Sequence, residues 1–206
     1  MPASGPLTPL LGRILLWLPV TFAIWYLTAA WHLAPVAWLA HHLLQLWLPE
    51  AVAELRLHGA QLLLISHFGE VGGQLVANPP PGENLGFLTN PLSYSYSLPL
   101  FAALALATPL PGRWRRLAIG LGVLLLIELA SMLATQIKTL AFETGGAFVA
   151  QQQWGAHARD AVALAYQLGS LLLPMVMPLV VWMAGAGGYL AQLSPRLRTP
   201  GKEYFR

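Results

Sequence analysis

The sequence predicts a mainly α-helical integral membrane protein, with about four transmembrane helices, one interfacial helix and a small extracytoplasmic β-hairpin element. Composition indicates this class, because 56% of the 206 residues are hydrophobic and only 9% are charged, whereas soluble domains carry roughly 25% charged residues. The apolar runs are also long, and about 18 apolar residues suffice to cross a bilayer. Because so little charge cannot cover a soluble globule, residues 1–206 are expected to form one membrane domain.

The first apolar run, residues 13–34, is predicted to be a transmembrane helix that begins at Arg13. A secretory signal peptide cleaved near Ala29 or Ala30 is the alternative interpretation. The apolar core of a signal peptide is typically only about 7–15 residues long, and this run is longer. A retained first span is therefore favoured.

The next segment, residues 35–51, is apolar but too short to be a typical span. It is bounded by Pro35 and Pro49, which are expected to limit a helix at both ends. Trp38 and Trp47 are typical of side chains that lie at headgroup depth. These features predict an interfacial helix that lies along the membrane surface.

The chain then changes character. It alternates apolar with polar residues and contains glycine pairs and a Pro-Pro-Pro-Gly turn, which predicts two or three short strands. Because open strand edges cannot lie in lipid, these strands must lie outside the bilayer. The expected order from here is an extracytoplasmic strand-like segment (52–92), a second span (93–110), a third span (117–140), an extracytoplasmic loop (141–163), a fourth span (164–191) and a cytoplasmic tail (192–206).

The basic residues predict the orientation of these spans, because Lys and Arg favour the cytoplasmic side. In a four-span order, only Arg56, Lys138 and Arg159 fall on one side. We therefore predict a multi-pass protein of the bacterial inner membrane with both termini in the cytoplasm. The basic residues on the predicted cytoplasmic side are Arg13, Arg113, Arg115, Arg116, Arg196, Arg198, Lys202 and Arg206.

Two ionisable residues lie within the third predicted span. A carboxylate near mid-membrane costs about 2.5–3.5 kcal/mol on insertion scales, so Glu128 is expected to face the helix bundle. It either handles protons or contacts another subunit, or it is a protonated carboxyl that hydrogen-bonds within the bundle. Lys138, at the outer end of the same helix, either extends its amine to the interface or holds a carboxylate or phosphate there.

The residue types exclude several kinds of chemistry. The chain contains no cysteine, so it has no disulfide, thiolate nucleophile or cysteine metal site. Zinc needs about three or four converging ligands, and His58, His67 and His157 show no tight spacing, so neither a metal site nor a cofactor is expected. The basic runs are short and adjacent to the spans, which indicates topology signals and contact with membrane lipid rather than nucleic-acid binding.

The stretch that opens the second span points to a known family. Residues 90–175 resemble the core of the exosortase/archaeosortase superfamily, membrane transpeptidases that cut and transfer proteins bearing a C-terminal sorting signal. That family has a motif of the type N-A-C-S-G-x-R-S at the outer mouth of a span, then a cytoplasmic Arg turn, an A-N-x-x-R sequence and a His. Residues 90–98, 113–116 and 134–138 and His157 stand in the corresponding order here.

The departures from the family pattern bear on catalysis. The family nucleophile would fall at Leu92, which has no reactive atom, and the family Arg would fall at Lys138, which keeps the charge but lacks the planar fork. The resemblance therefore implies a relative without the catalytic cysteine, like the exosortase H-associated membrane proteins encoded beside exosortases. An accessory role in protein sorting is what this resemblance implies.

Short polar and aromatic side chains at the outer mouth of the second and third spans form the candidate binding site. Because exposed sheet edges bind extended peptides by strand addition, we predict that this mouth binds an exosortase or a sorting-signal peptide. Tyr94 and Tyr96 have an alternative role as interfacial anchors. The candidate residues are Asn90, Ser93, Tyr94, Tyr96, Gln136, Lys138 and His157.

The leading functional prediction is a non-enzymatic accessory protein of an exosortase-type sorting system. A membrane peptidase or transferase that uses Ser93 or Ser95 with His157 is one alternative. A structural subunit that packs through the small residues 184–188 is another. A transporter built around Glu128 has little support, because the chain shows no broken-helix pairs in two halves.

Overall fold

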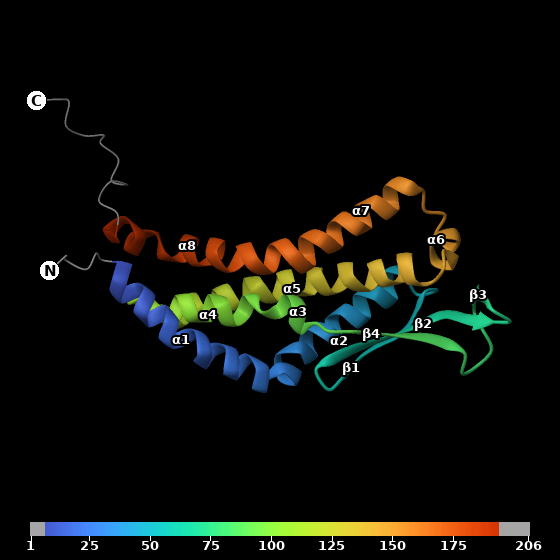
Figure 1. Cartoon of the computed structure of the whole chain (residues 1–206), viewed down its shortest axis with the longest axis horizontal. Helices are drawn as coiled ribbons and strands as arrows, with labels where there is room; N and C mark the ends of the chain where they lie inside the picture. The colour runs from blue at the N-terminus through green and yellow to red at the C-terminus, as the bar shows by residue number, and fades with distance from the viewer. Residues whose placement is uncertain (1–6, 194–206) are drawn as a thin grey trace, which may run out of the picture.

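The computed structural model describes residues 7–193 and confirms a mainly helical protein with a small antiparallel sheet (Figure 1). Three of its helical segments are long and apolar enough to cross a membrane, namely Thr8–Leu27, Arg113–Glu143 and Ala156–Leu190. The second predicted span corresponds to a shorter apolar segment, Leu92–Ala107. The long helices run along the length of the molecule, and the sheet lies at one end.

Eight α-helices, one π-helical turn and four strands make up the described residues. The strands follow the second helix directly. In chain order the elements are α1 (Leu7–Leu27), α2 (Ala29–Trp47), β1 (Val52–His58), β2 (Gln61–Val71), β3 (Gln74–Ala77), β4 (Asn84–Thr89), α3 (Leu92–Ser95), α4 (Ser97–Ala107), α5 (Arg113–Glu143), α6 (Ala147–Gln151), α7 (Ala156–Gln167), η1 (Leu168–Leu172) and α8 (Leu173–Leu193).

The break between the first two helices lies at Thr28, whereas the sequence predicted it at Pro35. Pro35 lies inside α2, which ends at Trp47. A proline removes one backbone hydrogen bond from a helix, and α2 retains its helical path because one face is buried against β1 and α5. The interfacial helix predicted for residues 35–51 is therefore the second half of a longer helix that packs on the sheet.

The sheet is built around the central strand β2. Its residues 61–66 pair with β1, residues 68–71 pair with β3, and residues 62–65 and 69 pair with β4, all in antiparallel orientation. Gly72 and Gly73, with φ of 60° and 81°, form the turn between β2 and β3, where positive φ favours glycine. The sequence predicted two or three strands here, and the structure has four.

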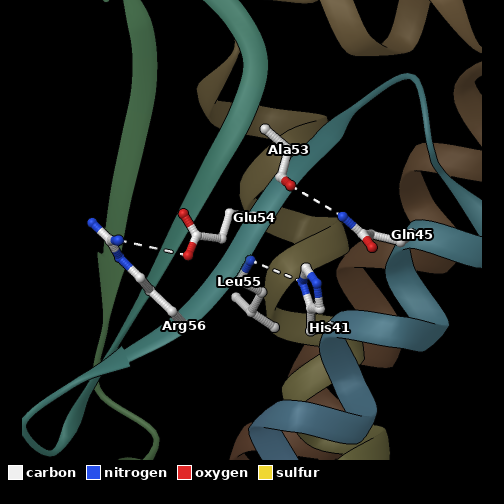
Figure 2. A network of polar contacts seen from close by, with 6 residues as sticks. All are labelled: His41, Gln45, Ala53, Glu54, Leu55 and Arg56. Atoms are coloured by element: carbon white, nitrogen blue, oxygen red, sulfur yellow. Dashed lines mark hydrogen bonds and ion pairs between the residues drawn. The ribbon is translucent and has the colours of Figure 1, made fainter.

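The outer edge of β1 is covered by side chains from α2 (Figure 2). His41 Nδ1 accepts a hydrogen bond from the Leu55 N–H at 3.1 Å. Gln45 Nε2 donates to the Ala53 carbonyl oxygen at 3.1 Å. An edge strand with unpaired backbone groups is a template for unwanted pairing, and α2 therefore closes this edge of the sheet.

The outer edge of β4 is open. Leu55 directs its N–H away from β2. In an antiparallel ladder, the backbone groups of its partner Leu64 then point towards β4, and those of Phe87, the β4 partner of Leu64, point towards β2. The neighbouring residues Gly86 and Leu88 consequently direct their backbone groups away from the sheet. Both residues are exposed, and within residues 7–193 β4 pairs with β2 alone.

The main hydrophobic core joins α2 and α5 to the inner face of the sheet. It includes the buried side chains of Leu44 on α2, Leu64 on β2 and Met132 on α5. At its outer end, the Phe68 and Phe148 rings meet edge to face with their centroids 6.2 Å apart. This core fixes the sheet against the end of α5, so the residues between β4 and α3 are held rigidly beside that helix.

A second, smaller core holds α4 and α5 together. Phe101 of α4 lies directly over Gly120 of α5, and a Cβ added to Gly120 would come 2.0 Å from the Phe101 ring. α5 has 31 residues and measures about 46 Å at 1.5 Å per residue. Because a bilayer core is about 30 Å thick, α5 is long enough to cross it and still reach the sheet.

The loop predicted for residues 141–163 is largely helical. α5 continues to Glu143, α6 follows, and α7 begins at Ala156, so the fourth apolar segment starts in a polar helical turn. α7 passes into α8 through the π-helical turn η1, where the Leu173 N–H donates to the Leu168 carbonyl oxygen. This shift leaves the Gly169 carbonyl free within the helix. The Ser131 hydroxyl of α5 lies 2.7 Å from this carbonyl oxygen and 2.9 Å from the Ile127 carbonyl oxygen of its own helix.

The described chain begins and ends at the same end of the molecule, opposite the sheet (Figure 1). The turn between α4 and α5, with Arg113, Arg115 and Arg116, lies at that end too. This arrangement agrees with the charge pattern, and the membrane sidedness itself stays a prediction. Of the predicted tail, residues 194–206 lie outside the described residues.

Candidate functional site

A cleft lies where β4, α3, α5 and α7 meet, at the sheet end of the helices. Its volume is about 220 Å³. It contains four of the seven binding residues predicted from the sequence, together with seven further ones. The lining residues are Leu88, Thr89, Asn90, Ser93, Tyr94, Thr135, Lys138, Thr139, Glu143, Tyr166 and Ser170.

One wall of the cleft is the turn that leads from β4 into α3. Asn90 Oδ1 accepts a hydrogen bond from the Leu92 N–H at 3.1 Å, the Asx-turn geometry that Asn-Pro sequences favour. Ser93 Oγ donates to the Asn90 carbonyl oxygen at 2.7 Å. The two polar side chains predicted here therefore hold the turn in shape, and both are exposed at the cleft.

The opposite wall carries the charged groups. Lys138 Nζ lies 2.7 Å from Glu143 Oε1 and 5.5 Å from the centroid of the Tyr166 ring. The lysine side chain thus lies between a carboxylate and an aromatic face, a position typical of a cation–π contact. Both charged side chains retain about a third or more of their exposure, at 31% and 45%, so the pair is open to a ligand.

The floor of the cleft contains Tyr94, which is only 2% exposed. Its hydroxyl has no hydrogen-bond partner among the described residues. Nearby, Gln136 is fully buried and donates from Nε2 to Thr89 Oγ1 at 3.1 Å, while its Oε1 has no partner there. Buried polar atoms normally have partners, so these atoms stand out as candidates for a ligand or water.

Glu128 lies deeper along α5 and is 1% exposed. Neither carboxylate oxygen has a hydrogen-bond partner within residues 7–193. Its side chain faces the bundle interior, as expected for an acidic residue in a span. It does not line the cleft.

Three of the predicted binding residues do not line the cleft. Gln136 bonds to the lining residue Thr89, and the other two lie away from the cleft. Tyr96 is half-buried at the junction of α3 and α4, and its carbonyl caps the first turn of α4. His157 is exposed on the first turn of α7. Ser95, a candidate nucleophile, is fully buried and accepts a hydrogen bond from Trp25 Nε1 at 3.2 Å.

Sequence reasoning missed several polar residues of the cleft. Thr135 and Thr139 lie one turn apart on α5, and Tyr166 and Ser170 lie one turn apart where α7 meets η1. The available signal was this pairing of polar residues at helical spacing inside apolar segments. Glu143 was missed because the predicted span ended at residue 140.

The cleft offers several polar groups that can bind a ligand. It offers hydroxyl groups, one amide and one cation–carboxylate pair at the end of an open strand edge. Ser93 donates to a backbone carbonyl, and His157 does not line the cleft. Among the described residues, no group of three or more His, Asp or Glu side chains is close enough to hold a metal ion.

Comparison with known proteins gives one match. The family model for the exosortase H-associated membrane protein matches residues 4–186. No curated protein and no solved structure matches the chain. Because the family model covers most of the sequence, the chain belongs to the family of exosortase H-associated membrane proteins.

Proposed function

We propose that this protein is a non-enzymatic accessory component of an exosortase-type protein-sorting system in the bacterial inner membrane. The family description supports an association with that system. The resemblance of residues 90–175 to the exosortase/archaeosortase core, with Leu92 in the place of the cysteine, favours a binding role over a catalytic one.

The open edge of β4 beside the cleft is the observation that carries the binding proposal. Gly86 and Leu88 direct their backbone groups outward, and residues two apart on a strand are separated by about 6.6 Å. An extended segment of a sorting-signal substrate can therefore pair with β4 as an additional strand. Its end would enter the cleft between Asn90 and Lys138.

The position of the cleft fits such a guest. The strands lie at one end of the helices. In the proposed orientation, this is the side on which a substrate would pass from its extracytoplasmic domain into its own membrane helix. Among the described residues, Lys138 is the only cation lining the cleft and Glu143 the only acid. A carboxylate on the guest would compete with Glu143 for Lys138 through a charge-assisted hydrogen bond.

Gly86 offers a sharp test of strand addition. Its backbone lies outside the positive-φ region, and a Cβ added there first meets Leu63 Cδ1 at an ordinary 3.4 Å. Gly86→Pro removes the outward N–H and leaves the bonds between β2 and β4, because proline is tolerated where the N–H of an edge strand faces solvent. Gly86→Ala adds a similar carbon and keeps the N–H.

The experiment is a pull-down from the native cells in mild detergent, followed by mass spectrometry. We expect an exosortase or a secreted protein with a C-terminal sorting signal to be recovered with the unsubstituted protein, with Gly86→Ala and with His157→Ala. Recovery should fall strongly with Gly86→Pro and with Lys138→Ala. Because His157 lies outside the cleft, its substitution is the matched control for Lys138.

Other outcomes would contradict parts of the proposal. Recovery of a sorting component by all variants would place the contact elsewhere on the chain. Recovery of an unrelated complex by all variants would favour the structural-subunit alternative. Recovery of no component of a sorting system by the unsubstituted protein would contradict the accessory role itself.

A further inference from the structure

A groove with a basic end lies between α4, α5 and α8, far from the sheet. It consists of two adjoining clefts that share Arg116, Val181 and Gly185. The smaller cleft, about 40 Å³, includes Arg113 and lies beside the turn between α4 and α5. The larger one, about 410 Å³, extends from Arg116 towards the middle of the molecule and is lined otherwise by apolar residues.

The basic end of the groove carries positive charge that the described residues do not neutralise. Neither Arg113 nor Arg116 forms an ion pair with any acid within residues 7–193. The other polar groups there are already satisfied, because Trp182 Nε1 donates to Thr108 Oγ1 at 2.9 Å. Two guanidinium groups are thus available for an anion, and the planar arginine fork suits phosphate.

The long part of the groove is apolar and open. Ile119, Val123 and Val180 line it, and a Cβ added to Gly185 would meet no atom within 4 Å. From Arg116 to Val123 the groove follows α5 for about 10 Å at 1.5 Å per residue. It therefore has room for an apolar chain that starts at the basic end and continues towards mid-membrane.

We propose that this groove binds one anionic phospholipid, with its phosphate on Arg113 and Arg116 and an acyl chain along α5 and α8. A single ligand with a negative head and an apolar tail matches both clefts and their shared boundary. Basic pockets between membrane helices on the cytoplasmic side bind anionic lipid headgroups in this manner. A neighbouring transmembrane helix would fill the apolar part but leave the two guanidinium groups without an anion.

Two pairs of matched variants test the site. Arg116→Gln removes a charge at the boundary of the clefts, whereas Arg115→Gln removes an adjacent charge that lines neither. Gly185→Leu fills the apolar part, whereas Gly187→Leu places the same side chain outside it. Neither glycine has an atom within 4 Å of an added Cβ, so the Cβ of each leucine meets no neighbouring atom.

The experiment measures thermal unfolding and lipid stoichiometry of the full chain, purified in an uncharged maltoside detergent. The probes are phosphatidylglycerol, phosphatidylcholine and inorganic phosphate. We expect phosphatidylglycerol alone to raise the melting temperature, and native mass spectrometry to retain one lipid per chain. Arg116→Gln and Gly185→Leu should weaken lipid binding by about tenfold or more, with Arg115→Gln and Gly187→Leu close to the unsubstituted protein.

Each opposite result would overturn the proposal. Equal losses of lipid binding with Arg115→Gln and Arg116→Gln would indicate a nonspecific attraction between the lipid and the basic residues. An equal rise in melting temperature with inorganic phosphate would indicate a site that binds an anion but no acyl chain. A dimer or a co-purifying helix that is lost with Gly185→Leu, whether or not lipid is present, would identify a protein occupant. Absence of any effect of phosphatidylglycerol on the unsubstituted protein would exclude the site.

Discussion

The Ser131 hydroxyl of α5 lies 2.7 Å from the Gly169 carbonyl oxygen in the π-helical turn. In this turn the Leu173 N–H bonds to the Leu168 carbonyl, one residue further back than in an α-helix. Pro174 follows, and it has no N–H to donate to the Ser170 carbonyl. Gly169 permits the approach, since an added Cβ would come 3.2 Å from the Ser131 Cα. The two longest helical segments are thus joined beside the cleft at a turn type often found at functional sites.

Ser131→Ala should lower the stability of the protein. The substitution leaves the Gly169 carbonyl without its interhelical partner, and such bonds contribute about 1 kcal/mol in membrane proteins. We expect a decrease of that size in the unfolding free energy, measured by denaturant titration in detergent. Ser170→Ala is the control, because its hydroxyl bonds only to Tyr166 of the same helical segment; an equal loss there would contradict the assignment.

Gly120→Ala should lower stability by disturbing the packing of α4 against α5. The added methyl group would overlap the Phe101 ring, at 2.0 Å, and overpacking of this kind costs about 1–3 kcal/mol. Gly122→Ala, two residues further along α5, meets nothing within 4 Å and should be neutral or slightly stabilising because alanine favours helix. Melting temperatures in detergent compare the two, and equal values would show that Phe101 moves without cost.

His41→Ala should expose the outer edge of β1. The Leu55 N–H would lose its acceptor, His41 Nδ1, and its hydrogen exchange should accelerate. Exchange measured by mass spectrometry on a peptide that covers β1 detects this change. The adjacent His42 bonds instead to the Trp38 carbonyl of its own helix, so His42→Ala should leave the exchange of Leu55 unchanged.

Glu128→Leu should raise stability. The carboxylate is buried and both its oxygens lack partners among the described residues, and a buried polar group without a hydrogen bond costs about 1–3 kcal/mol. Glu128→Gln keeps a polar amide and should gain less. Thermal unfolding in detergent ranks the three proteins. A fall in stability with Glu128→Leu would show that the carboxyl is hydrogen-bonded inside the bundle.

Composition was sufficient to predict the fold class, since long apolar runs with few charges have one common solution. Helix boundaries are harder to predict from the sequence, because they depend on packing between distant segments. The sequence predicts a helix boundary at Pro35, yet the buried face of α2 against β1 maintains the helix through it. The sequence predicts a loop over residues 141–163, where α6 and the start of α7 are helical, because a solvated helical turn and a loop have the same composition.

The candidate site was predicted in part. Asn90, Ser93, Tyr94 and Lys138 do line one cleft, because they lie next to the ends of elements that the main core holds together. His157 was placed there by its order in the sequence alone, and α7 carries it away from the cleft. Tyr166 and Ser170 replace it, one helical turn apart, and only the three-dimensional path of α7 and η1 reveals them.

The coverage of β1 by His41 and Gln45 has a consequence for assembly. A sheet that is open at both edges can add chains in both directions and grow into a polymer. Here α2 blocks one edge, and β4 leaves the other open. Each molecule therefore offers β4 as the edge for direct strand pairing, and copies of this chain that paired through β4 would stop at a dimer.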